Sequence, residues 1–179
     1  MSTEETGHLA IGFPPIADTR ARILILGSMP GVRSLETRQY YAHARNAFWP
    51  IMGVLFGAGP ELPYAERTAA LRASGIAVWD VFSRCHRPGS LDSAIDDRTA
   101  VVNDFAGFFR RHRRIRRVCF NGGKAASVYR RDVLPQVSLS APYLSHARLP
   151  STSPAYAAMR FEAKLEAWRN QLCSTADVE

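Results

Sequence analysis

The chain has 179 residues, of which 46% are hydrophobic and 22% charged, and it carries a formal net charge of +7. This length favours one domain over residues 1–179, with about 1–8 and 174–179 loose, and the apolar fraction excludes a mainly disordered chain. No apolar run approaches the ~20 residues of a membrane span, and the polar N-terminus lacks the features of a secretory signal, so we expect the chain to remain in the cytosol.

The first half of the chain is expected to hold two buried strands and two helices. Arg22–Gly27 is a short continuous apolar run that ends in glycine, which is typical of a strand buried on both faces. The remaining segments, in order, are an extended entry at Gly12–Pro15, a polar loop from Ser28 to about Asn46, helices over Ala47–Phe56 and Tyr64–Ser74, and a second strand over Ile76–Phe82.

The second half continues the alternation of strands and helices. We expect a loop over Ser83–Asp97, a helix over Thr99–His112, a strand over Arg117–Asn121, a helix to about Arg131, a minor strand at Val137–Leu139, and a last helix from Ala155 to about Leu172. This alternation predicts an α/β sandwich around a mostly parallel sheet.

Polar or glycine-rich loops follow the predicted strands. They are Gly27–Gly31, Asp80–Cys85, Asn121–Gly123 and Leu149–Ser153. Because functional sites of such sheets form at the carboxyl ends of the strands, these loops are expected to meet at one edge.

Cysteine and histidine are spaced unlike the ligands of a metal site. Cys85, Cys119 and Cys173 form neither a C-x-x-C pair nor an even-numbered disulfide framework, and no two of the five histidines stand at ligand spacing. The Gly27–Ser34 loop also lacks the lysine and the spacing of a phosphate-binding loop. We therefore predict no metal and no cofactor.

The segment Tyr40–Trp49 gathers four aromatic residues, a histidine, an arginine and an asparagine just before a helix. One interpretation makes Phe48 and Trp49 core residues and Asn46 a helix N-cap. The other is an aromatic-walled pocket for a planar ring, in which the amide holds water or substrate.

The segment Leu149–Ala155 places three hydroxyl residues between two prolines. Hydroxyls and free backbone N–H groups at the start of a helix suit a phosphate anion. The alternative is simple capping of that helix by Ser153.

Positive charge is carried almost entirely by arginine, since only Lys124 and Lys164 are lysines among the 23 basic residues. Six arginines fall within Arg110–Arg117. Such charge fits a polyanion such as nucleic acid. A genome of high GC content, which favours arginine codons over lysine codons, would explain the same composition. The alternative for the cluster is a solvated helix end. The cluster precedes a strand, which places it at the edge opposite the predicted site.

Taken together, these segments resemble the uracil-DNA glycosylase superfamily, and most closely its hypoxanthine (deoxyinosine) glycosylase branch. The resemblance runs from Gly12 to about Trp168. The segments on which it rests are Gly27–Gly31 with Ser34–Leu35, Tyr40–Trp49, Trp79–Val81 with Gly89–Ser93, Phe120–Lys124, and Leu149–Pro154. It implies a three-layer α/β/α sandwich around a mostly parallel four-stranded sheet, and hydrolysis of the N-glycosidic bond of deaminated bases, uracil or hypoxanthine, in DNA.

The resemblance also implies roles for individual residues. Mismatch-specific relatives carry a water-positioning asparagine in the first motif, where this chain has Met29, so Asn46 takes over as the catalytic residue. The base would be held by Ser28 and the backbone around Met29, stacked on Tyr41 or Phe48, read at its edge by Asp80 and Asn121, and contacted by His43. DNA would be gripped by Ser151, Thr152 and Ser153, with Pro154, Ala155 and Tyr156 entering the gap left by the extruded base.

We expect a monomeric, monofunctional enzyme that leaves an abasic site, because Lys124 and Lys164 are the only lysines available for a Schiff base. The alternatives are a DNA-binding protein without catalysis and a hydrolase of free nucleosides, of which the net charge of +7 disfavours the second.

Overall fold

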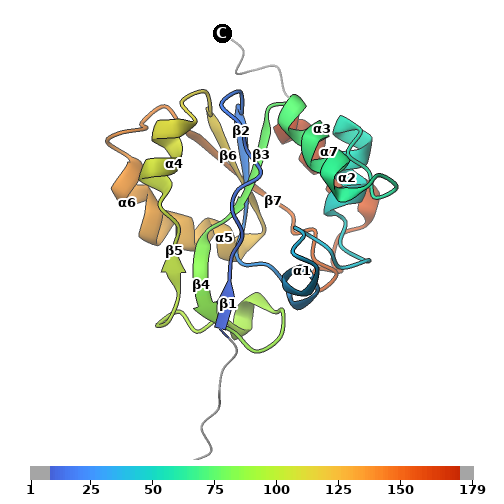
Figure 1. Cartoon of the computed structure of the whole chain (residues 1–179), viewed down its shortest axis with the longest axis horizontal. Coiled ribbons are helices and arrows are strands. Elements are labelled where there is room, and N and C mark those ends of the chain that lie inside the picture. The colour runs from blue at the N-terminus through green and yellow to red at the C-terminus, as the bar shows by residue number, and fades with distance from the viewer. Residues whose placement is uncertain (1–8, 174–179) are drawn as a thin grey trace, which may run out of the picture.

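Four parallel strands form the central sheet of the structure, a computed structural model that describes residues 9–173 (Figure 1). Their order is β3-β2-β6-β7, with β2 at Ile23–Gly27, β3 at Ile76–Asp80, β6 at Arg117–Asn121 and β7 at Ser145–Leu149. The predicted loose ends, 1–8 and 174–179, lie outside the described residues. All five residues of β3 are buried, as expected of a strand covered on both faces.

Helices cover both faces of this sheet (Figure 1). One layer consists of α2 (Phe48–Phe56), α3 (Tyr64–Ala73) and α7 (Phe161–Leu172). The other consists of α4 (Phe105–Arg111), α5 (Gly123–Val128) and α6 (Leu134–Val137), with the π-helical turn η2 (Tyr129–Val133) joining the last two. The predicted three-layer α/β/α sandwich around a four-stranded parallel sheet is confirmed.

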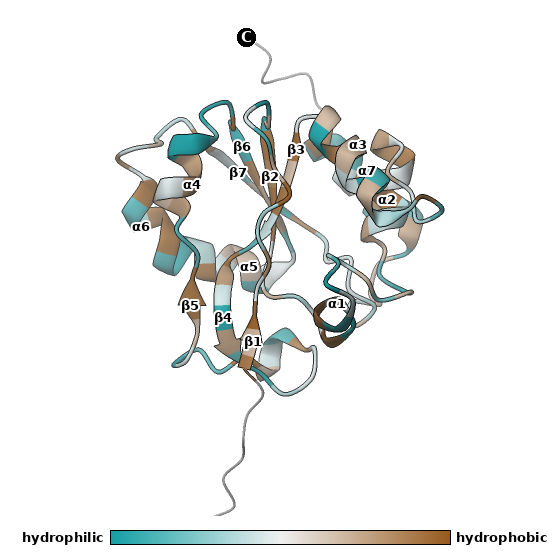
Figure 2. Ribbon diagram, viewed as in Figure 1, coloured by the Kyte–Doolittle hydropathy of each residue, from teal (hydrophilic) through white to brown (hydrophobic). Residues whose placement is uncertain are grey.

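The hydrophobic core lies between the sheet and the two helical layers. Figure 2 shows the brown of apolar residues along much of β2 and β3. Leu24 and Leu26 of β2 are fully buried, as are Phe108 from one helical layer and Trp168 from the other. Burial of a large apolar side chain contributes about 1.5–3 kcal/mol, so these contacts hold the strand ends in fixed positions.

A second, antiparallel sheet was not predicted. It pairs β1 (Leu9–Ile11) with β4 (Phe82–His86) and β4 with β5 (Val101–Val102). The expected loop over Ser83–Asp97 is therefore wrong, since it contains most of β4 and the short helix η1 (Asp92–Ala94). The residues of β4 vary between buried and exposed, so β4 lacks the continuous apolar run of a central strand.

Several predicted boundaries also need correction. Helix α4 begins at Phe105 rather than Thr99, because the Asp104 carboxylate accepts the Gly107 N–H at 2.8 Å and caps it. Helix α7 begins at Phe161 rather than Ala155. The expected strand at Val137–Leu139 is absent, since Val137 ends helix α6. A short helix, α1 (Val32–Thr37), lies in the expected loop after β2. No helix within residues 9–173 is long and apolar enough to cross a membrane.

Candidate active site

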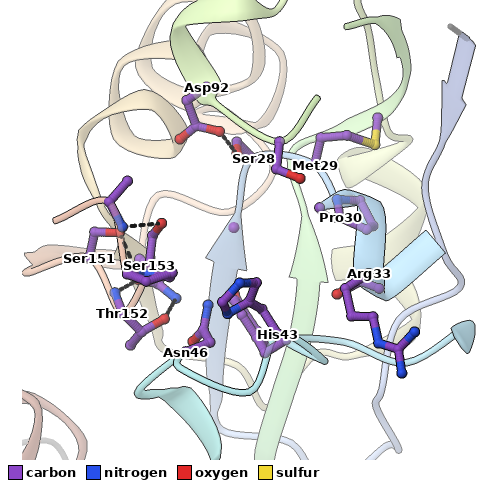
Figure 3. Close-up of a pocket in the computed structure, with 18 of the residues that line it drawn as sticks. Ser28, Met29, Pro30, Arg33, His43, Asn46, Asp92, Ser151, Thr152 and Ser153 are labelled. Atoms are coloured by element: carbon purple, nitrogen blue, oxygen red, sulfur yellow. Dashed lines mark hydrogen bonds between the residues drawn. The ribbon is translucent and has the colours of Figure 1, made fainter. Parts of the chain in front are cut away.

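A pocket of about 490 Å³ opens at the carboxyl ends of the parallel strands (Figure 3). The carboxyl ends of β3 and β6 and the loops after β2 and β7 contribute to its wall, so the predicted strand ends do meet there. Most of the residues expected in the site line it: Ser28, Met29, Tyr41, His43, Asn46, Asp80, Asn121, Ser151, Thr152, Ser153, Pro154, Ala155 and Tyr156. A pocket of this size holds a small ligand.

The floor of the pocket is formed by Gly27, Asp80 and Tyr41. A Cβ atom on Gly27 would lie 2.4 Å from Asp80 Oδ1 and 2.9 Å from the Tyr41 hydroxyl, so any larger residue there would force these side chains to move. Asp80 is 3% exposed, and its Oδ2 atom has no hydrogen-bond partner among the described residues. An unsatisfied buried oxygen thus belongs to a residue that lines the pocket.

The charge state of Asp80 is set by its surroundings. Burial, together with repulsion from the Asp92 carboxylate, raises the pKa of Asp80 to about 7, although the Arg87 guanidinium opposes the shift. At neutral pH the protonated form, which can donate a hydrogen bond, is therefore populated.

Aromatic residues of the Tyr40–Trp49 segment divide between core and pocket. The ring of Tyr41 stacks on Phe48, with 3.9 Å between centroids. Phe48 is fully buried and is absent from the pocket wall, so the prediction that it stacks on a base is corrected: Phe48 supports Tyr41 from behind. Trp49 belongs to the core, where its Nε1 donates to the Tyr40 carbonyl at 2.8 Å.

Asn46 is not the N-cap of α2, which is Ala47, but its side chain still contacts the start of that helix. Its Oδ1 atom accepts the Phe48 N–H at 3.0 Å, which satisfies a free donor at the start of α2. The side chain is half-buried and lines the pocket. A carbonyl oxygen has two lone pairs, so Oδ1 can still accept a second hydrogen bond, and the contact with Phe48 holds the amide in one orientation.

His43 stands exposed at the pocket wall (Figure 3). Its Nδ1 atom accepts the Arg45 N–H at 3.1 Å. In the neutral ring this leaves the proton on Nε2, which can donate to an oxygen of a ligand.

Asn121 and Thr152 are joined by two hydrogen bonds of 2.9 Å. Asn121 Nδ2 donates to Thr152 Oγ1, and the Thr152 N–H donates to Asn121 Oδ1. Thr152 is 1% exposed, so the expectation that its hydroxyl contacts a phosphate is corrected: the hydroxyl ties the end of β6 to the loop after β7.

The other hydroxyls of this loop remain half-buried at the pocket. Ser151 Oγ accepts the Ser153 N–H, and Ser153 Oγ accepts the Ala155 N–H, both at 3.2 Å. Because α7 starts only at Phe161, the loop supplies no helix N-terminus for a phosphate, contrary to expectation. Tyr156 is exposed, and its carbonyl accepts Lys164 Nζ at 2.8 Å.

Sequence reasoning gave no role to several residues of this site, among them Arg87, Ser90 and Asp92. Arg87 is 2% exposed and donates to the Met29 and Pro30 carbonyls, while Ser90 and Asp92 line the pocket. The sequence did offer a signal for Ser90 and Asp92, because Gly89–Ser93 is one of the segments that carry the family resemblance. Nothing in the sequence shows which loop this segment contacts.

Within residues 9–173, no three His, Cys, Asp or Glu side chains gather as a candidate metal site. Cys85 and Cys119 are buried and Cys173 is exposed, and each is a free thiol.

Comparisons with known proteins agree on one family. The model of the uracil DNA glycosylase superfamily matches residues 14–173. A hypoxanthine DNA glycosylase of Methanosarcina acetivorans is 37% identical over 136 residues, which cover 71% of this chain and 85% of the relative. One of Methanosarcina barkeri is 38% identical over 115 residues, 64% of this chain and 72% of the relative. A solution NMR structure of a candidate uracil DNA glycosylase from M. acetivorans superimposes with a TM-score of 0.73 at 32% identity, covering 93% of this chain and all of that one.

Proposed function

The chain belongs to the uracil DNA glycosylase superfamily, and from this premise we propose that it is a DNA glycosylase that hydrolyses the N-glycosidic bond of deaminated bases, hypoxanthine and uracil, in DNA repair. The observation that carries this proposal is the pocket at the strand ends with the unpartnered, buried Asp80 Oδ2 on its floor. The enzyme acts as a monomer in the compartment that holds the DNA, the cytosol or nucleoid.

The target base enters the pocket after its nucleotide leaves the stack, as an enzyme that acts on a base in duplex DNA requires. Tyr41, backed by the fully buried Phe48, offers a rigid ring against which the base can lie. The Ser28–Met29 corner and His43 contact the remaining edges.

Base choice follows from what deamination changes. It replaces an exocyclic amine, a hydrogen-bond donor, by a carbonyl oxygen, an acceptor, in both hypoxanthine and uracil. The O–H of protonated Asp80 donates to that oxygen, whereas the amine of adenine or cytosine would place a second donor against this O–H, so the O–H favours the deaminated bases. A donor deep in the pocket therefore accepts both deaminated bases and rejects their parents.

Bond cleavage leaves positive charge on the sugar, and a water molecule must reach C1′. Asn46 orients this water through the lone pair of Oδ1 that Phe48 leaves free. The proposed reaction uses no metal and no lysine. Lys124 is paired with Asp97 at 2.7 Å and Lys164 is buried, and neither lines the pocket.

DNA is held at the rim of the pocket. The Ser151 and Ser153 hydroxyls contact the phosphates that flank the lesion, and Tyr156, with Pro154 and Ala155, fills the gap left by the extruded nucleotide. The exposure of Tyr156 beside the pocket supports this wedge assignment.

One assay separates this function from its two alternatives. Purified protein is incubated in EDTA with oligonucleotides that carry one hypoxanthine, one uracil or neither, followed by alkaline cleavage. We expect strand scission only where a deaminated base is present. DNA that is retarded in a gel but never cut would indicate a binding protein, and release of base from free deoxyinosine alone would indicate a nucleoside hydrolase. Loss of activity in EDTA would contradict a metal-free reaction.

A further inference from the structure

A carboxylate to which the proposed mechanism gives no direct contact with the substrate stands at the rim of the pocket. Asp92 opens the short helix η1, is exposed, and lines the pocket. Figure 3 shows its carboxyl group beside Ser28, whose Oγ donates to Asp92 Oδ1 at 2.5 Å. Asp92 and Asp80 are the only acidic residues among those that line the pocket.

The loop that carries Asp92 is fastened to the loop after β2. The buried Arg87 donates to the Met29 carbonyl at 3.3 Å, to the Pro30 carbonyl, and to Gly89 of its own loop at 2.9 Å. On the other side of this loop, Ser90 Oγ accepts the Val32 N–H at 2.8 Å. These contacts, with that of Ser28, fix where the Asp92 carboxylate lies relative to the pocket floor.

The position of Asp92 suits the sugar rather than the base. The base reaches the floor at Gly27 and Asp80, so the deoxyribose to which it is attached lies nearer the rim. As the C1′–N bond breaks, positive charge develops on that sugar, and a carboxylate fixed close by lowers the energy of the transition state. Met29, in the loop after β2, is uncharged and cannot stabilise positive charge on the sugar in this way.

We propose that Asp92 is a catalytic residue of this glycosylase, whose carboxylate, held by Ser28, stabilises the oxocarbenium-like sugar during bond cleavage. In this step the C1′–N bond breaks with its electron pair going to the base. The oxygen of the water held by Asn46 then bonds to C1′, and the proton that the water loses neutralises the base anion. This inference rests on the proposed function.

The assignment predicts opposite effects on binding and on rate. A carboxylate at the mouth of a DNA site repels the phosphates, so its charge weakens binding of the ground state. Removing the charge should therefore tighten DNA binding while it slows the reaction. A residue with only a structural role would weaken both.

The test measures both quantities in the full chain. Asp92→Asn keeps the size of the side chain and an acceptor for Ser28. We expect single-turnover excision of hypoxanthine from a duplex to fall by about 10²–10³-fold, the range for one fixed polar group in a site. The Kd for a duplex with a stable abasic-site analogue should decrease several-fold. Glu166→Gln, which removes an exposed carboxylate of α7 outside the pocket, is the matched control and should change neither quantity by more than about twofold.

A second variant distinguishes direct catalysis from support of the loop. In Asp92→Ala the lost carboxylate leaves space at the solvent-exposed rim, so sodium formate should restore part of the rate, whereas sodium chloride at equal ionic strength should not. An Asp92→Asn protein that cuts at the wild-type rate, or an Asp92→Ala protein that formate does not rescue, would overturn the assignment. A wild-type protein that excises neither base would overturn the proposed function, and this inference with it.

Discussion

Asn46 lines the pocket, and its Oδ1 atom is held by the Phe48 N–H, so a substitution of Asn46 tests the water-positioning role most directly. We expect Asn46→Ala to lower single-turnover excision by about 10²–10³-fold, because the water loses its oriented acceptor, while DNA binding is kept. Because the same side chain satisfies the Phe48 N–H, the variant should also lose about 1 kcal/mol of stability.

Asn170→Ala, a change at an exposed position of α7, is the control and should match the wild type. Both proteins are compared at a temperature at which thermal unfolding shows each to be folded. Normal excision by the Asn46 variant would refute the role.

Asp80 should give the reaction its dependence on pH. In the proposed mechanism the protonated carboxyl donates to the base, and its pKa is about 7, so the single-turnover rate should fall as pH rises through 7. Asp80→Asn replaces the acid by an amide that donates at every pH. We expect its rate to stay level between pH 6 and 9, and Asp80→Ala to be slow throughout.

The dependence of folding stability on pH provides a separate measurement of the raised pKa of Asp80. The folded pKa lies above the ordinary value of 3.8, so the protonated form stabilises the fold fully below pH 3.8, and this contribution is lost as pH rises through 7. From this group, the free energy of unfolding should fall by up to about 1.4 kcal/mol per pH unit between those limits. Denaturant titrations of Asp80→Asn should lack this component, and an identical slope in both proteins would contradict the raised pKa.

At the scale of elements, the central strands and their order along the chain followed from the sequence because buried parallel strands are continuous apolar runs, as in Ile23–Gly27. Strand β7 gave no such signal: it pairs only with β6, at the sheet edge, and most of its residues are exposed. The location of the pocket could be predicted, since the carboxyl ends of parallel strands meet at one edge of the sheet. Contacts between loops, such as Arg87 with Met29, depend on tertiary packing and could not be predicted.

The paired hydrogen bonds of Asn121 and Thr152 join two of these elements at the pocket. Thr152→Val keeps the shape of the side chain and removes the hydroxyl that accepts from Asn121. We expect the free energy of unfolding to fall by about 1 kcal/mol, and the excision rate to fall by less than about tenfold because the loop after β7 is held less firmly.

Urea unfolding and single-turnover kinetics measure the two effects. Ser127→Ala, which removes a hydroxyl that bonds only to the Lys124 carbonyl of its own helix, is the control. A loss of rate as large as that of Asn46→Ala would show that this pair takes part in the chemistry itself.

At the scale of the whole molecule, positive charge is distributed over both ends of the sheet. Arg110, Arg113 and Arg114 are exposed around the turn between α4 and β6, at the end opposite the pocket. We expect their joint replacement by alanine to leave excision from a short, saturated duplex within about twofold, and to slow capture of long DNA at low salt several-fold.

The wild type and the triple alanine variant are compared at a low and a high salt concentration, since long-range attraction is screened at high ionic strength. The wild type should bind DNA more weakly as salt increases. A flat salt dependence would contradict the expected grip on phosphates, and an equal loss on short and long DNA would place the cluster in the substrate site.

The scarcity of lysine predicts that base excision is not followed by a lyase step. Neither described lysine reaches the pocket, so the enzyme should leave an intact abasic site. Treatment with borohydride during the reaction should trap no covalent DNA adduct, whereas a trapped adduct would reveal a lyase step.

The missing side chain of Gly27 limits how this enzyme can diverge. Every missense mutation of its codon adds a Cβ atom, which would lie 2.4 Å from Asp80 Oδ1. Descendants of this gene can therefore alter the walls of the pocket step by step through single substitutions, and so broaden or narrow the set of lesions they repair. Raising its floor at this position requires the side chains of Asp80 and Tyr41 to move, because the added Cβ atom would also lie 2.9 Å from the Tyr41 hydroxyl. New specificities in this lineage should arise from the loops, while the depth of the pocket is inherited unchanged.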